Sequence, residues 1–167
     1  PHESAVRVPL VLSGPGFDTG RNVQSVRSLV DLPPTLLDVA GIDVPDVMRG
    51  ESLLSVIKGD TPDADGDAFI QVSESQVGRA LRTDRWKYAV AAPTMTGWRG
   101  GNAEQSSDIY VERYLYDLWS DPGETVNLAG RPEYRDVAND LRERLLEYIA
   151  DIEGEKPSIK QFDRGFP

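Results

Sequence analysis

The chain has 167 residues, no cysteine, and 28 acidic against 18 basic residues, which gives a formal net charge of -10 at pH 7. This length suffices for one substantial core or two small ones. The lack of cysteine excludes disulfides, thiolate metal sites and a cysteine nucleophile within these residues. The negative charge argues against nucleic acid as a partner, because such a surface repels phosphates. No run of about 18 consecutive apolar residues occurs, so we expect no membrane-spanning helix.

The chain starts at Pro1 rather than at a methionine, and we interpret it as a piece of a longer protein. Its first part, residues 1–60, has the pattern of an α/β unit. Residues 8–12 form a continuous apolar run that is typical of a strand covered on both faces. Asp31 can cap a helix that carries two prolines in its first turn and ends at Gly41. The apolar side chains along one side of this helix are Leu32, Leu36, Leu37 and Ala40.

An acidic linker ends this first part. Residues 52–57 predict a short second helix, and residues 59–67 contain little that a core would bury. The acidic spacing from Asp63 onward resembles a calcium loop, but Ala68 stands where such a loop needs glycine. The residues after it predict a strand rather than the helix that follows a calcium loop. We therefore predict a solvated linker and no metal site.

The second part, residues 61–167, changes to strand periodicity and ends in a helix. Strands are expected at residues 68–73, 78–83, 86–90 and 110–118. A helix is expected from about residue 132 to 152, because apolar side chains recur there every three or four residues. That stripe consists of Tyr134, Val137, Leu141, Leu145, Ile149 and Ile152. The predicted fold is an α/β segment followed by an α+β subdomain, with about four antiparallel strands and one long C-terminal helix.

Three stretches, taken in chain order, resemble the C-terminal part of the sulfatase family, within the alkaline phosphatase superfamily. The first is Glu3-Ser4-Ala5-Val6-Arg7-Val8-Pro9-Leu10 with the Gly-Pro-Gly turn after it. The second runs through residues 28–37 and 50–54. The third joins residues 78–88 to Leu115-Tyr116-Asp117-Leu118, Asp121-Pro122 and residues 124–129. By this resemblance, residues 1–60 are the end of an alkaline-phosphatase-like α/β domain and residues 61–167 are the family's C-terminal subdomain.

The resemblance implies hydrolysis of sulfate esters, or of sulfamates in some members. The family's nucleophile is a formylglycine hydrate, made from cysteine or serine in a Cys/Ser-x-Pro-x-Arg motif beside a calcium ion. Ser13-Gly14-Pro15-Gly16-Phe17 copies this spacing without the arginine, so we interpret it as a turn. The acidic calcium ligands have no counterpart here. We expect no catalytic residue in the chain, and therefore no activity of the chain alone; nucleophile and calcium would belong to an upstream domain on which it packs.

Three residues are candidates for substrate contact. His2, the only histidine, matches a position near the family's active-site lysine, and its imidazole can donate a hydrogen bond to a sulfate oxygen. Trp98 and Arg99 lie in a polar loop at residues 93–108, where an indole can stack on a sugar and a guanidinium can pair with sulfate. The alternatives are a frayed terminal residue and a loop without a ligand. The expected partner is a sulfated small molecule or glycan.

Two other functions are compatible with the sequence. A phosphodiesterase or phosphonate hydrolase of the same superfamily would share the fold, and its nucleophile motif would separate it from a sulfatase. A module without catalysis would serve packing, oligomerisation or glycan binding. The compartment stays open, because a signal peptide would lie upstream of these residues.

Overall fold

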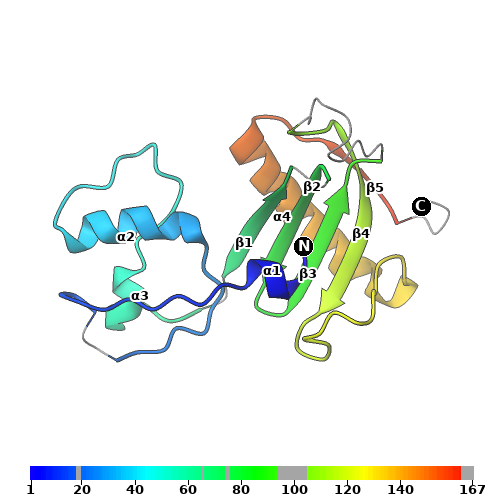
Figure 1. Cartoon of the computed structure of the whole chain (residues 1–167). Coiled ribbons are helices and arrows are strands. Elements are labelled where there is room, and N and C mark those ends of the chain that lie inside the picture. Colours follow the sequence, from blue (N-terminus) through cyan, green and yellow to red (C-terminus); the bar gives the residue numbers. More distant parts are fainter. Residues whose placement is uncertain (18–19, 65, 74–75, 94–104, 163–167) are drawn as a thin grey trace. The chain divides into compact units, whose positions relative to one another are not determined.

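The chain divides into two units, with boundaries between Arg7 and Val8 and between Ala68 and Phe69. The helical unit is Val8–Ala68, and the sheet unit joins Pro1–Arg7 to Phe69–Pro167. The computed structural model describes residues 1–17, 20–64, 66–73, 76–93 and 105–162 (Figure 1). The first seven residues therefore belong with the sheet, although the sequence next to them belongs with the helices.

Five strands form one sheet in the order β1-β2-β3-β4-β5. The strands are β1 (Asp67–Val72), β2 (Gly78–Thr83), β3 (Trp86–Ala91), β4 (Ile109–Asp117) and β5 (Ser158–Lys160). β2 pairs antiparallel with β3, and β3 with β4, whereas β5 pairs in parallel with β4. The four strands predicted from the sequence are present. β5 is an addition, because the tail does not simply cover the surface: Ser158 donates its backbone N–H to Asp108 O at 2.8 Å.

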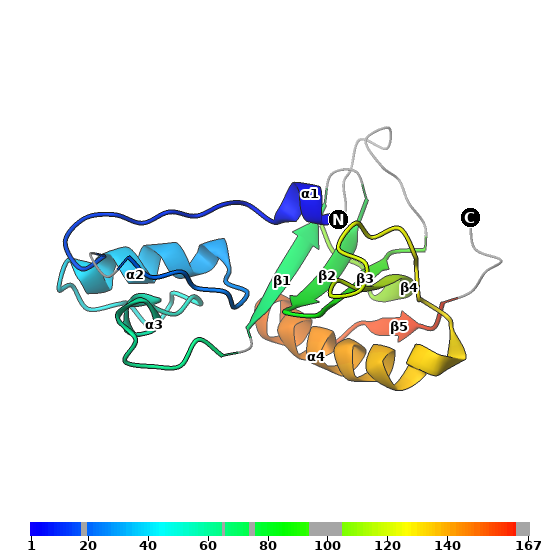
Figure 2. The same ribbon diagram turned by 90° about the horizontal axis from the view of Figure 1, so that it is seen from below.

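A long helix, α4 (Arg135–Glu153), covers one face of the sheet and confirms the predicted C-terminal helix (Figures 1 and 2). A 3-10 turn, η2 (Pro132–Tyr134), leads into α4, and Gly154 ends it at φ 89°. Its buried side chains are Ala138, Leu141, Leu145 and Ile149, and they pack with Leu81, Tyr88, Val90, Tyr110 and Leu115. Burial contributes about 1.5–3 kcal/mol for each large apolar side chain. Ile152 is 36% exposed, because it lies in the last turn beyond this core.

A four-residue helix, α1 (Glu3–Val6), lies on the opposite face of the sheet (Figure 2). Leu81 of β2 and Tyr88 of β3 face α4 and belong to its core. Because side chains alternate along a strand, the adjacent Arg82 and Lys87 face α1 and contact it. No residue of α1 is buried, so polar contacts rather than apolar packing hold this helix on the sheet.

A β-bulge in β4 changes which of its side chains face each helix. Ala89 and Val90 are neighbours on β3, but their partners on β4 lie two positions apart. Arg113 is the extra residue, and the alternation of side chains shifts by one position there. Glu112 therefore lies on the α4 side, whereas Tyr114 lies on the α1 side, although an unbroken strand would place both on one face.

The helical unit contains α2 (Leu32–Val39) and α3 (Leu54–Lys58), which match the two predicted helices. The start of α2 differs from the prediction. A 3-10 turn, η1 (Leu29–Asp31), precedes α2, and the carboxylate of Asp31 accepts the backbone N–H of Ser28 at 2.9 Å. Asp31 therefore closes a capping box for η1 and makes no side-chain cap to α2.

Apolar residues of the helical unit are more exposed than the sequence predicts. In α2, Pro34 and Thr35 are the buried residues, whereas Leu36 is 56% exposed. Residues 8–12 do not form the predicted strand, and Val11 is 88% exposed. A strand needs a hydrogen-bonded neighbour, and the described residues of this unit up to residue 64 include no strand that could pair with it.

Asp63 holds the acidic linker against the helical unit. Its carboxylate accepts the backbone N–H of Gln24 at 2.7 Å and hydrogen bonds from the hydroxyl and amide of Ser25. The Ser25 hydroxyl is the main reason that the pKa of Asp63 lies below its usual value. Asp65, which continues the acidic spacing, lies outside the described residues. The linker is thus tied down at Asp63 rather than freely solvated there.

Candidate functional site

A group of buried and half-buried charged residues, which we call the Lys87 cluster, lies between α1 and the sheet. It comprises Glu3, Arg82, Lys87 and Glu124. The Lys87 ammonium contacts the carboxylate of Glu3 at 3.3 Å and that of Glu124. Arg82 donates a hydrogen bond to the other carboxylate oxygen of Glu3 at 3.1 Å. The side chains of Lys87 and Glu124 are only 1% and 3% exposed, so this ion pair is shielded from water.

The formal charges of the Lys87 cluster balance, because two cations face two carboxylates. Burial alone would raise the pKa of Glu3, but the hydrogen bonds and charges of Arg82 and Lys87 outweigh it and hold this pKa below its usual value. A buried ion costs several kcal/mol unless a partner compensates it. Each member of the cluster therefore depends on the others.

The turn after β4 brings Glu124 into the cluster. Asp121 shapes this turn: its carboxylate accepts the Thr125 hydroxyl at 2.9 Å and the backbone N–H of Val126 at 2.8 Å. Glu124 has φ 55°, and it is the only non-glycine residue with positive φ in the described part of the chain. This left-handed conformation costs a side chain about 1–2 kcal/mol. The contacts of the Glu124 carboxylate offset that cost.

His2 is attached to the same carboxylate. Its ring Nδ1 lies 3.2 Å from Glu124 Oε2, and the backbone N–H of Glu3 donates to that oxygen at 2.6 Å. The His2 side chain is nevertheless 64% exposed. Its ring centroid lies 6.3 Å from that of Tyr116, whose ring stacks on Tyr114 at 5.9 Å. His2 thus belongs to a row of three rings on the α1 side of the sheet.

A second buried carboxylate, Glu112, organises the α4 side of the sheet. It accepts hydrogen bonds from both terminal nitrogens of Arg135, at 2.9 and 2.5 Å. The Tyr88 hydroxyl donates to it at 3.0 Å, and the backbone N–H of Phe162 at 2.9 Å. Burial opposes ionisation, but these donors prevail and keep the pKa of Glu112 below its usual value. We call this group the Glu112 cluster; it joins sheet, helix and tail, and its partners are all structural.

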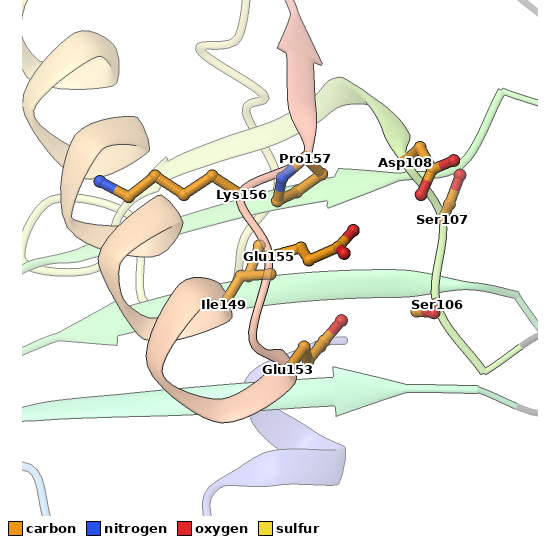
Figure 3. A pocket seen from close by; sticks show the side chains of 8 residues that line it. All are labelled: Ser106, Ser107, Asp108, Ile149, Glu153, Glu155, Lys156 and Pro157. Carbon is orange, nitrogen blue, oxygen red and sulfur yellow. The ribbon is translucent and has the colours of Figure 1, made fainter.

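A pocket of about 190 Å³ opens beside the C-terminal end of α4 (Figure 3). It is lined by residues 106–108, Ile149, Glu153 and residues 155–157. The carboxylates of Glu153 and Glu155 point toward residues 106–108, whereas the Lys156 ammonium extends away from them (Figure 3). Glu153 pairs with buried Arg79 at 2.5 Å. A pocket with three carboxylates, including that of Asp108, repels a sulfate group and does not fit the predicted ligand.

The structure places one of the three predicted contact residues. His2 lies at the edge of the Lys87 cluster, whereas Trp98 and Arg99 lie outside the described residues. Sequence reasoning did not single out Lys87 or Glu124. Lys87 gave a signal, because it is the one charged residue in a strand that is otherwise apolar and aromatic. That pattern does not reveal its partners, since they lie in distant parts of the chain.

The described residues do not fit the calcium ion that the sulfatase resemblance implies. No group of three or more histidine, cysteine, aspartate or glutamate side chains is placed to hold a metal ion within the part of the chain that the structure describes. We assign no step to a metal here. Among the same residues, no helix has the length and apolar character needed to cross a membrane.

Solved structures identify the class of this fold. A 2-O GAG sulfatase is similar with a TM-score of 0.53 and 31% identity, over 72% of this chain and 24% of that one. A protein solved in complex with its substrate D-glucosamine-2-N,6-O-disulfate has a TM-score of 0.54 at 24% identity, which shows a shared fold alone. The sheet with α4 is therefore the C-terminal fold of sulfatases, and the predicted fold class is confirmed.

The sequence places the chain within a family. The family described as N-sulphoglucosamine sulphohydrolase, C-terminal, matches residues 1–99, and the chain belongs to it. Arylsulfatase K of Mus musculus is 32% identical over 86% of this chain. An ulvan-active sulfatase of Formosa agariphila is 28% identical over 90%, and a Delta 4,5-hexuronate-2-O-sulfatase of Bacteroides thetaiotaomicron is 29% identical over 95%. The resemblance to the C-terminal part of sulfatases is confirmed.

The chain spans only part of these relatives. It covers 25% of the length of the mouse arylsulfatase K, 28% of the ulvan-active sulfatase and 32% of the hexuronate sulfatase. The family match includes His2, Glu3, Arg82 and Lys87, whereas Glu124 lies beyond it.

Proposed function

We propose that this chain is the C-terminal part of a hydrolase that cleaves sulfate esters or sulfamates. In this role it supplies one wall of the substrate pocket and a stabilising subdomain, and it is inactive alone. The family match over residues 1–99 carries the proposal. The three relatives described above are all named sulfatases, which favours sulfate esters over phosphate esters as substrates.

We assign the substrate to the sulfated sugars and glycans. Two relatives support this class, because their names refer to ulvan and to a hexuronate 2-O-sulfate. The exposed ring of His2, held at the edge of the sheet, is our first contact residue. Trp98 and Arg99 are proposed as further contacts, by stacking on a sugar and by pairing with a sulfate group.

The nucleophile and the metal belong, in this proposal, to an upstream domain. We assign a formylglycine and a calcium ion to that domain, and we interpret residues 1–60 as the end of its α/β fold and residues 61–167 as the C-terminal subdomain. Exposed apolar side chains of the helical unit support packing against it. They are Val8, Leu10, Val11, Leu29, Val30, Leu36, Ile42, Val44 and Val47.

The complete reading frame tests the proposal. We expect it to encode a Cys/Ser-x-Pro-x-Arg motif upstream, and the expressed protein to cleave 4-nitrophenyl sulfate or a sulfated monosaccharide. The 167-residue chain alone serves as the matched control and is expected to cleave neither. A reading frame without the motif, or hydrolysis of phosphodiesters in preference to sulfate esters, would contradict the proposal.

A further inference from the structure

The side chain of His2 has one ring nitrogen in use and one available. Nδ1 lies 3.2 Å from Glu124 Oε2, and no hydrogen bond of the described residues involves Nε2. A carboxylate accepts hydrogen bonds, so the Nδ1 atom that contacts it carries the proton. In a neutral imidazole the second nitrogen then has a lone pair and can only accept. The contact with Glu124 therefore decides what the exposed side of His2 can bind.

Two cations already pair with the carboxylates next to His2. Lys87 contacts Glu124 and Glu3, and Arg82 contacts Glu3. The ring of His2 lies beside that of Tyr116.

The unfavourable backbone conformation of Glu124 is a second observation that supports a role for its carboxylate. Glycine would adopt φ 55° without cost, and the residue before it in the turn is Gly123. Glu124 adopts this conformation and directs one oxygen toward Lys87 and the other toward the His2 ring and the Glu3 amide. The turn thus holds the exposed imidazole of His2 through the contact of its Nδ1 atom with Glu124.

We propose that Glu124 is a positioning residue that holds His2 as the Nδ1–H tautomer, so that Nε2 accepts a hydrogen bond from a hydroxyl group of the sulfated sugar. This extends the proposed function and rests on it for the identity of the ligand. It also changes the role expected from the sequence: His2 recognises the sugar rather than the sulfate group. Tyr116 beside His2 is buried, whereas Tyr114, whose ring stacks on that of Tyr116, is 39% exposed.

The tautomer can be measured without any substrate. His2 is the only histidine of the 167-residue chain, so its ring nitrogens give the only imidazole signals in a 15N NMR spectrum. In the neutral ring we expect a protonated Nδ1 and an unprotonated Nε2. In Glu124→Ala, which removes the acceptor, we expect this preference to be lost. A wild-type spectrum with the proton on Nε2, or averaged between both nitrogens, overturns the proposal even if Glu124→Ala does not fold.

The ligand is tested by kinetics on the complete enzyme with two substrates. In His2→Asn the side-chain amide still donates to Glu124 but nothing replaces Nε2, whereas His2→Gln reaches the Nε2 position with an amide that can also accept. We expect His2→Asn to raise KM for a sulfated monosaccharide by about 5- to 10-fold, the effect of one hydrogen bond, with kcat unchanged. The glutamine variant should recover part of this loss.

The second substrate, 4-nitrophenyl sulfate, has a sulfate group but no sugar hydroxyl. We expect the same KM for wild type and His2→Asn with this compound. An equal loss on both substrates would assign His2 to the sulfate or to folding and would overturn the proposal. If the wild-type enzyme cleaves neither compound, the proposed function fails, while the NMR measurement still decides the role of Glu124.

Discussion

A buried carboxylate lies on each face of the sheet, and the two carboxylates differ in how exposed their hydrogen-bond partners are. On the α4 side, every partner of Glu112 is a structural donor, and the cluster links helix, sheet and tail. On the α1 side, Glu124 has Lys87 as its buried partner but also holds a largely exposed imidazole. Buried charge thus serves architecture on one face and supports a solvent-facing group on the other. The burial of the carboxylate does not distinguish the two roles. They are distinguished by whether one of its partners is exposed to solvent.

The largest expected effect comes from removing the cation shared by two carboxylates. Lys87→Met leaves Glu3 and Glu124 without their common partner, and we expect a loss of about 3–5 kcal/mol in the free energy of unfolding. Urea denaturation followed by tryptophan fluorescence measures it, since all three tryptophans lie after residue 68. Lys156→Met, at an exposed position of the same unit, is the control and should change stability by less than about 0.5 kcal/mol. Similar losses in the free energy of unfolding for Lys87→Met and its control would contradict the role of Lys87 as the buried partner of both carboxylates.

The corresponding change on the other face should cost less. Arg135→Met removes two hydrogen bonds to Glu112 but leaves those from Tyr88 and Phe162, so we expect a loss of about 1.5–3 kcal/mol. The His2 ring signals should stay as in wild type, because the two clusters lie on opposite faces. Arg131→Met provides the exposed control. A shift of the His2 signals in Arg135→Met would show that the faces are not independent.

Acid should weaken both clusters. The pKa values of Glu3 and Glu112 lie below the ordinary value of 4.5, so the unfolded chain binds more protons as the pH falls below that value. Stability is therefore fully present above about pH 5 and is lost as the pH falls through the folded pKa values. In Glu112→Gln we expect the slope of stability against pH to fall by at most about 1.4 kcal/mol per pH unit, the effect of one proton. An unchanged slope between pH 5 and 3, from urea titrations, would exclude Glu112 from this titration.

The smallest effect is expected at an ion pair that water reaches. Arg85 pairs with Asp117 at 2.7 Å and lies over the rings of Trp86 and Trp119, but its side chain is 45% exposed. Arg85→Ala should therefore lower the free energy of unfolding less than any of the changes above, measured by circular dichroism during urea unfolding. A loss as large as that of Lys87→Met would show that burial is not what distinguishes the Lys87 cluster.

The sequence predicted the elements whose signal is local. The apolar stripe of α4 repeats every three or four residues. The four strands have strand periodicity and are separated by turn residues. The helix and the strands could therefore be recognised without knowing their partners. The strand expected at residues 8–12 is absent, because a strand exists only when another strand pairs with it. The opposite is true of β5: its three residues have no clear sequence pattern, and they form a strand because they pair with β4.

The candidate site was predictable only in part. Composition and resemblance drew attention to His2, but nothing local links it to Glu124. Lys87 and Glu124 lie within stretches that carry the sulfatase resemblance, yet each alone has the pattern of a polar residue in a strand or turn. The bulge at Arg113, which turns Tyr114 and Tyr116 toward His2, also has no sequence signal of its own.

By itself, the order of residues determined the family, the long helix and the four main strands, since these follow from periodicity and from motifs read along the chain. The tertiary structure decided which charges meet: Glu3, Lys87 and Glu124 come together because α1 lies across β3 beside the turn that follows β4. Interactions between ions depend on distance and burial, and only folding sets both for residues so far apart in sequence.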